Sequence, residues 1–438
     1  MINFKDEARK IEAEIIANRR LLHRNPELGF QEHWTTAFIK EQLVSYGIEV
    51  QPFWQQPGDT GVVGLLEGGL PGPCVALRAD IDALPIEENS GCAFKSERPG
   101  VMHACGHDSH MAALLGAAKL LAAVRGSLRG KVKFIFQPAE EITNGAASMI
   151  RAGVLENPRV DFIFGLHCTP GAEAGVMLVP RGATTACVAM TSLTVSGQGG
   201  HGALPHLTKD PVLASAALIM ALQSVVSREV QPGNSAVVTF GSIHGGSAPN
   251  IIPESVELKG TVRAAKSEVF HYIGEAMRRI IDHTAEALRV KTEFVFQQDV
   301  PGCFNPPQWA DLLVQGAKAT LAQGLPESPT QDQQGPLSKI YGAEGLLPAE
   351  AAMVGEDFAC YQERVPGIFC WYGVGNRERG ISASLHNPGF DLDESALPLA
   401  AAAHAQVAYD LLTGGLLAAH LENTANLIKP ETGGPVPR

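Results

Sequence analysis

The 438-residue sequence lacks an excess of basic residues and has few cysteines, and each shortage excludes a class of protein. Lysine and arginine together number 34 against 46 aspartates and glutamates, which gives a net charge of -12. A nucleic-acid-binding surface requires a concentration of basic side chains, so we expect no nucleic-acid partner. Eight cysteines, none of them in a C-x-x-C pair, are too few for a disulfide scaffold. They favour reduced thiols in the cytoplasm.

The sequence also lacks long apolar runs. No uninterrupted apolar segment reaches the ~18 residues that a membrane-spanning helix requires. The segment Met1–Arg24 carries charges throughout and contains no apolar stretch of the kind found in secretion signals. We therefore expect a cytoplasmic protein that has no membrane partner and acts on a small molecule.

Buried strands alternate with helices in the first part of the chain. The apolar runs 61–66, 75–79, 132–136 and 162–166 are bounded by turn residues, and an apolar helix is predicted over 111–124. Such alternation predicts an α/β domain whose ligand crevice lies beyond the carboxyl ends of the strands. Four acidic or imidazole side chains fall at these strand ends: Asp80, Glu140, Glu141 and His167.

A second domain is predicted over residues 184–297. Its elements follow the order β-α-β-β-α-β, the ferredoxin-like α+β arrangement with two helices on one face of a sheet. The alternative is that these strands join the first sheet, but the complete order favours an insertion. The ranges 1–183 and 298–438 then form one discontinuous catalytic domain, with helices on both faces of a mixed sheet. The range 326–348 is expected to be a long loop, and no role is assigned to it.

Residues 103–110 place three histidines, a cysteine and an aspartate directly before the apolar helix. Cys105 as thiolate and His107 as neutral imidazole are good ligands for Zn²⁺ or a related first-row cation. Gly106 between them suits a turn in which both side chains converge. The alternative is a histidine-rich surface turn, or a helix N-terminus capped by His107 and Asp108.

Two adjacent carboxylates follow the strand 132–136. Glu140 and Glu141 cannot point the same way on a regular element, so one can bind metal while the other faces the substrate. A dinuclear hydrolase needs ligands for two cations about 3.5–4 Å apart and a carboxylate that accepts a proton from the water between them. Taken singly, Cys105 is more often a small buried residue and His167 a histidine with ordinary partners. Their occurrence together at successive strand ends favours the metal site.

Seven motifs give the sequence a resemblance to a known family. They occur in order from about Leu22 to about Leu412, and together they resemble the metal-dependent amidohydrolases related to aminoacylase and carboxypeptidase G. Within that group the sequence is most similar to the hippurate hydrolase and auxin-amino-acid-conjugate hydrolase branch. The motifs are RADIDALP (78–85), HACGHD (103–108), FQPAEE (136–141), GGHG (199–202), APNIIP (248–253), GEDF (355–358) and HNPGFD (386–391).

The resemblance implies a role for each matching residue. Cys105 would bridge two divalent metal ions. The other ligands of these ions would be His107, Glu141, His167 and His386. Glu140 would be the general base that activates the bridging water. In the inserted lid and dimerisation domain, His201 would reach the active site of the neighbouring subunit of a homodimer and polarise the scissile carbonyl. Asn250 and Arg263 would hold the carboxylate of the substrate.

Two departures from the wider family concern the metals. Many members have His-x-Asp where this sequence has Arg-Ala-Asp80, so a histidine ligand is absent there and Asp80 is expected to act behind the ligands. Cys105 replaces a bridging carboxylate, which leaves Mn²⁺ or Zn²⁺ as the expected metals and Co²⁺ or Ni²⁺ as alternatives. Three residues are then expected to support or cap the site rather than bind metal: His103, Asp108 and His110.

The expected function is hydrolysis of the amide bond in an N-acyl or N-aroyl amino acid, such as a hippurate-like substrate. The products would be a carboxylic acid and an amino acid. Two alternatives remain: a dipeptidase or carboxypeptidase of the same fold, and a non-catalytic metal-binding protein, in which Glu140 would be superfluous. The acyl group, the amino acid and the physiological metal stay open, because motifs do not place the side chains that line those pockets.

Overall fold

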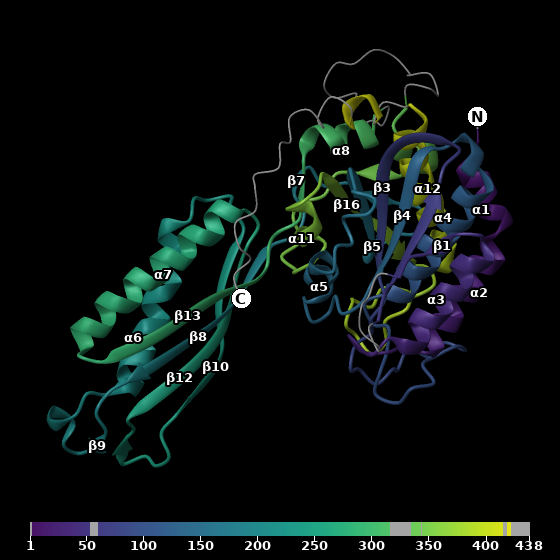
Figure 1. Cartoon of the computed structure of the whole chain (residues 1–438). Helices are drawn as coiled ribbons and strands as arrows, with labels where there is room; N and C mark the ends of the chain where they lie inside the picture. The colour runs from purple at the N-terminus through teal and green to yellow at the C-terminus, as the bar shows by residue number, and fades with distance from the viewer. Residues whose placement is uncertain (1, 53–59, 316–333, 343, 415–417, 422–438) are drawn as a thin grey trace. The chain divides into compact units, whose positions relative to one another are not determined.

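The chain folds into two compact units in the computed structural model (Figure 1). The residues that the structure describes are 2–52, 60–315, 334–342, 344–414 and 418–421. The first unit is made of Met1–Gly182, Asn305–Ala349 and Cys360–Arg438, and the second of Ala183–Phe304 and Glu350–Ala359.

The second unit extends beyond the range 184–297 expected from the sequence: its first segment runs from Ala183 to Phe304, and it also includes the later stretch Glu350–Ala359. Backbone hydrogen bonds attach this stretch: Ala352 N donates to the Thr184 carbonyl at 2.9 Å, and Ala186 N donates to the Val354 carbonyl at 3.0 Å. These bonds join residues more than 150 positions apart, so no local pattern in the sequence predicts them.

A mixed eight-stranded sheet forms the centre of the first unit. In spatial order its strands are β1 (Glu49–Val50), β2 (Val62–Glu67), β4 (Arg129–Gln137), β3 (Leu70–Asp80), β5 (Phe162–Glu173), β16 (Gly367–Gly375), β6 (Met177–Leu178) and β15 (Leu346–Leu347). The central strands β4, β3, β5 and β16 run parallel to one another. Their carboxyl ends therefore lie along one edge of the sheet, where open α/β sheets bind ligands.

Helices cover both faces of this sheet, as predicted. On one face α4 (His107–Ala123) packs against α12 (Leu397–Thr413), and both helices are buried over most of their length. On the other face α5 (Gly145–Arg151) lies beside β4. The remaining helices are α1 (Phe4–Lys10), α2 (Glu12–Arg24), α3 (His33–Ser45), α8 (Pro307–Leu313), α10 (Pro336–Tyr341) and α11 (Ala359–Gln362), with 3-10 turns at Arg125–Ser127 and Glu394–Ala396.

The prediction of a long loop over 326–348 is wrong for part of that range. Residues 326–333 lie outside the described residues, but α10 begins at Pro336 and buries Leu337 and Ile340 against the core. Proline is favoured at the first position of a helix because its missing N–H would have no partner there. The composition of the range hides this helix, which is too short to show a repeating apolar pattern.

The second unit is a ferredoxin-like domain, as predicted. Its antiparallel sheet has the order β10 (Ala236–Gly245), β12 (Ser255–Ala264), β8 (Cys187–Ser196) and β13 (Lys291–Val300). Two helices, α6 (Pro211–Ser224) and α7 (Ser267–Leu288), pack on it and on each other. A two-stranded ribbon pairs β9 (Gly200–His201) with β11 (Ile251–Ile252). The short strands β7 (Gly182–Ala183) and β14 (Phe304–Asn305) pair at the junction of the chain segments.

One helix among the described residues is long and apolar enough, by length and composition, to cross a membrane. It is Pro211–Glu229, which joins α6 to the π-helical turn Val225–Glu229. Ser215, Gln223 and Ser224 interrupt it, so it is not the uninterrupted apolar run that the sequence analysis excluded. Core helices pass the same test, and Leu218 and Leu222 of α6 are fully buried in the core of the second unit. The observation is weak evidence for a membrane.

Candidate dinuclear metal centre

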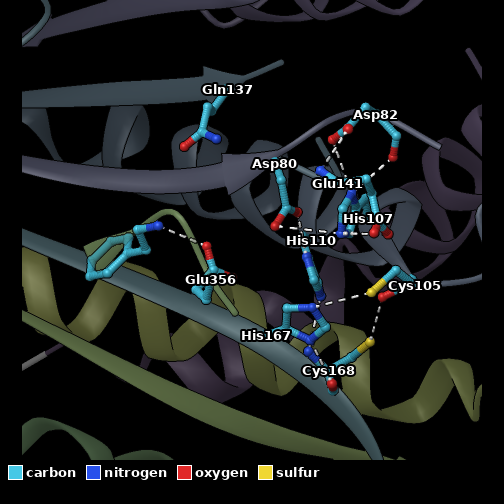
Figure 2. A network of polar contacts seen from close by, with 12 residues as sticks. Asp80, Asp82, Cys105, His107, His110, Gln137, Glu141, His167, Cys168 and Glu356 are labelled. Atoms are coloured by element: carbon cyan, nitrogen blue, oxygen red, sulfur yellow. Dashed lines mark hydrogen bonds and ion pairs between the residues drawn. The ribbon is translucent and has the colours of Figure 1, made fainter. Parts of the chain in front are cut away.

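Three elements of the first unit bring imidazole and carboxylate side chains to the carboxyl edge of its sheet (Figure 2). Asp80 is the last residue of β3, His167 lies in β5, and His107 is the first residue of α4. Their side chains, together with that of His110, lie close enough for one ligand atom of each to fall within 4.8 Å of the others. The strand ends thus meet as the sequence predicts.

The turn between Cys105 and His107 requires glycine. Gly106 has a φ of 79°, in the left-handed region, and a Cβ at this position would collide with the sulfur of Cys168. Glycine adopts this conformation without a steric penalty. The Cys-Gly-His spacing therefore places a thiol and an imidazole on either side of a turn that no other residue fits.

The ring of His107 is held in the orientation of a metal ligand. Its Nδ1 lies 2.8 Å from the backbone carbonyl of Asp82, which can only accept, so Nδ1 carries a proton. Its Nε2 is fully buried and has no hydrogen-bond partner among the described residues. Metal-binding histidines donate one ring N–H to a carbonyl or carboxylate in this way and leave the other nitrogen for the cation.

The surroundings of His107 attract positive charge. Burial lowers its pKa, but the nearby carboxylates of Asp80, Asp82 and Glu141 outweigh burial and raise the pKa to about 10. The Nε2 atom lies 3.6 Å from Asp80 Oδ2 and 3.9 Å from Glu141 Oε1. A divalent cation at Nε2 would take the place of a proton that these carboxylates otherwise hold there.

His167 has the same proton arrangement. Its Nδ1 donates to the carbonyl of Cys168 at 2.7 Å, and its Nε2 lies 3.5 Å from Cys105 Sγ. Burial, together with the neighbouring rings of His110 and His107, holds the pKa of His167 well below its usual range. The ring is therefore neutral, which is the form that binds metals.

His110 lies in the same group but both of its nitrogens are engaged. Nδ1 lies 2.6 Å from Asp80 Oδ1, and Nε2 accepts a hydrogen bond from Cys168 N at 2.9 Å. No lone pair is left for a cation. This geometry supports the expectation that His110 acts behind the ligands, where it orients Asp80.

A second group of donors is formed by Cys105 and two residues from later parts of the chain, Glu141 and His386. Cys105 Sγ and Glu141 Oε2 lie 3.3 and 3.4 Å from Nε2 of His386. Glu141 Oε1 is buried and has no hydrogen-bond partner among the described residues. Burial and the carboxylates of Glu141 and Glu140 raise the pKa of the Cys105 thiol well above its usual range. A cation is therefore needed to hold the thiolate form here.

These side chains fit two divalent cations. They supply one sulfur, three imidazole nitrogens and carboxylate oxygens, and two buried donor atoms among them, His107 Nε2 and Glu141 Oε1, have no hydrogen-bond partner. Sulfur and imidazole donors suit first-row cations such as Zn²⁺, whereas carboxylates also suit Mn²⁺. The five expected ligands belong to one unit and come together as a set.

Asp80 lies beside the ligands rather than in the open. It is fully buried, with Oδ2 2.8 Å from Arg78 Nη1 and Oδ1 against His110. Burial opposes its ionisation, but His107, His110 and Arg78 beside it outweigh burial and hold its pKa well below the usual range. Its geometry supports the expected supporting role.

Sequence reasoning missed Asp82, which holds two of the expected ligands. Its carbonyl accepts from His107, and its carboxylate Oδ2 accepts the backbone N–H of Glu141 at 3.0 Å. The only signal in the sequence is the Asp-x-Asp alternation at the end of β3, which puts two carboxylates just beyond one strand. Alternation does not reveal which of them reaches the later loop.

The other expected site residues lie in the second unit, where the structure brings two of the three together. His201 of β9 is exposed and pairs with Ile251 of β11, and Gly202 N donates to the Asn250 carbonyl at 2.9 Å. Arg263 lies near the other end of β12, where its guanidinium donates to the Met353 carbonyl at 2.9 Å.

A largely buried set of sulfur, imidazole and carboxylate donors lies at the carboxyl edge of an α/β sheet, with a further acid, Glu140, beside it. This arrangement defines a metal-dependent hydrolase. The chain belongs to the peptidase family M20/M25/M40, whose sequence profile matches residues 76–410. Membership of this family establishes a metal-dependent amidohydrolase and disfavours the non-catalytic alternative.

Named relatives agree with this class. The chain is 38% identical over 387 residues to N-acetyl-L-cysteine deacetylase of Bacillus subtilis (strain 168), covering 88% of this chain and 85% of that protein. It is 38% identical over 395 residues to IAA-amino acid hydrolase ILR1-like 4 of Arabidopsis thaliana, covering 90% and 84%. Among solved structures it resembles the Bacillus subtilis YXEP protein, described as a dinuclear metal binding peptidase from the M20 family. Identity there is 34%, the TM-score is 0.75, and 92% of this chain and 99% of that chain are covered.

Proposed function

We propose that the protein hydrolyses the amide bond of N-acyl or N-aroyl amino acids, with hippurate-like compounds among its substrates. The observation that carries this proposal is the pair of buried, unpartnered donor atoms, His107 Nε2 and Glu141 Oε1, next to the acid Glu140. The names of two relatives, a deacetylase of N-acetylcysteine and a hydrolase of an amino-acid conjugate, support an acyl amino acid as the substrate class.

The residues divide into ligands, base and supports. The cations are held by five side chains: Cys105, His107, Glu141, His167 and His386. We expect the cations to be Mn²⁺ or Zn²⁺, with Co²⁺ or Ni²⁺ as alternatives. When bound, the cations polarise the scissile carbonyl and lower the pKa of the attacking water. Glu140 takes the proton of that water and returns it to the leaving amine. Asp80 and Asp82 keep the ligands oriented.

We propose that His201 and Asn250 act in the active site of the partner subunit of a homodimer, and that Arg263 acts in a different site from these two residues. About eight strand residues separate the two ends of β12, or roughly 27 Å. One small substrate cannot touch both ends of the second unit of a single chain. His201 would stabilise the oxyanion, and Arg263 and Asn250 would hold the substrate's carboxylate.

An apolar face on α6 supports self-association through the second unit. Val212, Leu213 and Met220 are 45%, 62% and 74% exposed, which is unusual for large apolar side chains on one helix. A two-fold axis beside α6 would let this face pack against its own copy, because such interfaces use the same patch on both subunits.

Mixing inactive variants tests the role of His201 in the partner's site. His201→Ala and Glu140→Ala chains are each expected to be inactive. After subunit exchange half of the dimers are mixed and each has one intact site, so about a quarter of wild-type activity should return. Native mass spectrometry checks the exchange, and His283→Ala, an exposed histidine of α7, serves as the matched control that stays active alone. Complete exchange without recovered activity would contradict the assignment.

A dipeptidase or carboxypeptidase activity is the alternative within the same fold, and the description of the YXEP protein as a peptidase favours keeping it. Rates on hippurate-like compounds and on dipeptides with the same carboxyl-terminal residue separate the two. A higher kcat/KM for the dipeptides would contradict our proposal and support the peptidase alternative.

We also infer a cytoplasmic location. All eight cysteines are free of disulfides, and six of them are buried, which suits a reducing compartment. Cell fractionation with a cytoplasmic marker tests this inference.

A further inference from the structure

The loop from Pro138 to Gly145 carries the proposed base and is folded tightly. Ala139 has a φ of 54°, a left-handed conformation that costs energy for any residue with a Cβ. Its carbonyl accepts from Gly145 N at 3.1 Å, and the Glu140 carbonyl accepts from Thr143 N at 2.7 Å. Such a conformation persists only where the surroundings hold it.

Two buried carboxylates hold the backbone on either side of Glu140. Glu32 Oε1 accepts the N–H of Ala139 at 2.9 Å, and Asp82 Oδ2 accepts the N–H of Glu141 at 3.0 Å. Both acceptors come from segments far from this loop in the sequence. The backbone amides of the residues before and after Glu140 are therefore each hydrogen-bonded to a buried carboxylate.

Glu32 is itself held in place. It is 0% exposed, and its second oxygen, Oε2, accepts from Thr60 Oγ1 at 2.6 Å. Two glycines allow the close approach of its neighbours to the loop. A Cβ on Gly61 would lie 2.8 Å from Pro138 Cδ, and one on Gly29 would lie 3.2 Å from the Cα of Ala139.

We propose that Glu32 is a positioning residue for Glu140. By accepting the hydrogen bond of the Ala139 amide, Glu32 fixes the left-handed turn that sets the direction of the Glu140 side chain. This inference rests on the proposed role of Glu140. Glu32 itself does not bind metal and does not touch the substrate. Its loss is expected to lower kcat and to leave KM and the metal content nearly unchanged, because the ligand Glu141 is held separately by Asp82.

A matched pair of buried glutamates separates positioning from stability. Glu27, 7% exposed, accepts the N–H groups of Trp34 at 3.1 Å and Thr35 at 2.9 Å at the start of α3. Glu27→Met and Glu32→Met each leave buried or half-buried amides without an acceptor, so both should lower the melting temperature. Only Glu32→Met should also lower kcat, by roughly 10–100-fold, as expected for a misplaced reacting group.

The conservative variant Glu32→Gln provides the rescue. Its amide oxygen can accept from Ala139 N while its NH₂ group donates to Thr60 Oγ1, so kcat should stay within about 3-fold of wild type. If Glu32→Met does not fold, Glu32→Asp serves as the test variant instead, because its carboxylate is one methylene further from the Ala139 amide. An unchanged kcat in Glu32→Met or Glu32→Asp, or an equal loss in Glu27→Met, would overturn the proposal.

Amide hydrogen exchange of the 136–145 peptide, measured by mass spectrometry, gives a readout that does not depend on the reaction. Glu32→Met should speed exchange in this peptide, whereas Glu27→Met should not. If the metal-loaded wild type hydrolyses no N-acyl amino acid, the proposed function fails, and the exchange result still decides whether Glu32 holds the loop. Unchanged exchange in Glu32→Met would overturn the positioning role even in an active enzyme.

Discussion

Most candidate residues of the first unit are buried, unlike the exposed His201 of the second unit. His386, whose side chain is 54% exposed, is the exception in the first unit. In the first unit Cys105, His107 and His167 are at most 7% exposed, and the ring protons of both histidines are assigned by backbone carbonyls. In the second unit His201 is exposed, and its Nδ1 accepts a hydrogen bond from its near neighbour Ala203 N at 3.0 Å. The first set is preorganised within one unit, whereas the second set needs another surface to complete its surroundings.

The largest expected effect concerns the base of the preorganised set. Glu140→Ala should retain both metal ions, because none of the five ligands is removed, and should lose at least about 10²–10⁴-fold in kcat. Steady-state rates on N-acyl amino acids, with elemental analysis of the same sample, check this. Near-normal turnover in a metal-loaded Glu140→Ala protein would remove Glu140 from the mechanism.

A smaller loss is expected when a support of the same set is removed. Asp82→Ala frees the Glu141 amide and should weaken metal affinity or activity by about 10–100-fold, the usual effect of losing a group that orients metal ligands. Asp161→Ala is the matched control, because Asp161 Oδ2 also accepts a backbone N–H, that of Cys74, at 2.8 Å at the other edge of the sheet. Equal metal affinity in both variants would mean that Asp82 does not organise the site.

A further effect is on stability rather than on the reaction, and it depends on pH. His23 is buried between Asp108, 2.8 Å from Nδ1, and Glu88, 3.2 Å from Nε2. Burial opposes its charge, but attraction to Asp108 outweighs burial and raises the pKa of His23 from 6.5 to about 10. The charged form therefore stabilises the fold fully below pH 6.5, and this contribution is lost as the pH rises towards 10.

Urea unfolding at pH 7 and pH 10 measures this contribution. The wild type should lose more stability over that interval than His23→Gln, with a difference on the order of a few kcal/mol. The same slope in both proteins would show that His23 is neutral in the folded state. His283→Gln, at an exposed position of the second unit, should keep the slope of the wild type.

The sequence predicted those parts of the site that follow local rules. Asp80, Glu140 and His167 stand just after apolar runs, so their meeting at one sheet edge could be inferred from strand alternation alone. The ferredoxin-like domain was predictable because its element order is complete. The Cys-Gly-His turn could be inferred because glycine between two donor residues suits their convergence.

Other parts depend on contacts that leave no local trace. His386 lies 281 positions after Cys105, and only the family resemblance pointed to it. Glu32 and Asp82 act through single hydrogen bonds to a loop far away in the sequence, and glutamate or aspartate near a turn has many ordinary explanations. The helix α10 was hidden by prolines and glycines, and the attachment of Glu350–Ala359 to the second unit depends on backbone pairing.

The most direct test of the central claim is a metal titration of the apoenzyme. Hydrolysis of an N-acyl amino acid is measured while Mn²⁺ or Zn²⁺ is added in known equivalents per chain, and bound metal is measured in parallel. A dinuclear site predicts that activity saturates at two equivalents and that His167→Ala binds less metal. Full activity at one equivalent, or hydrolysis by the metal-free protein, would contradict the account.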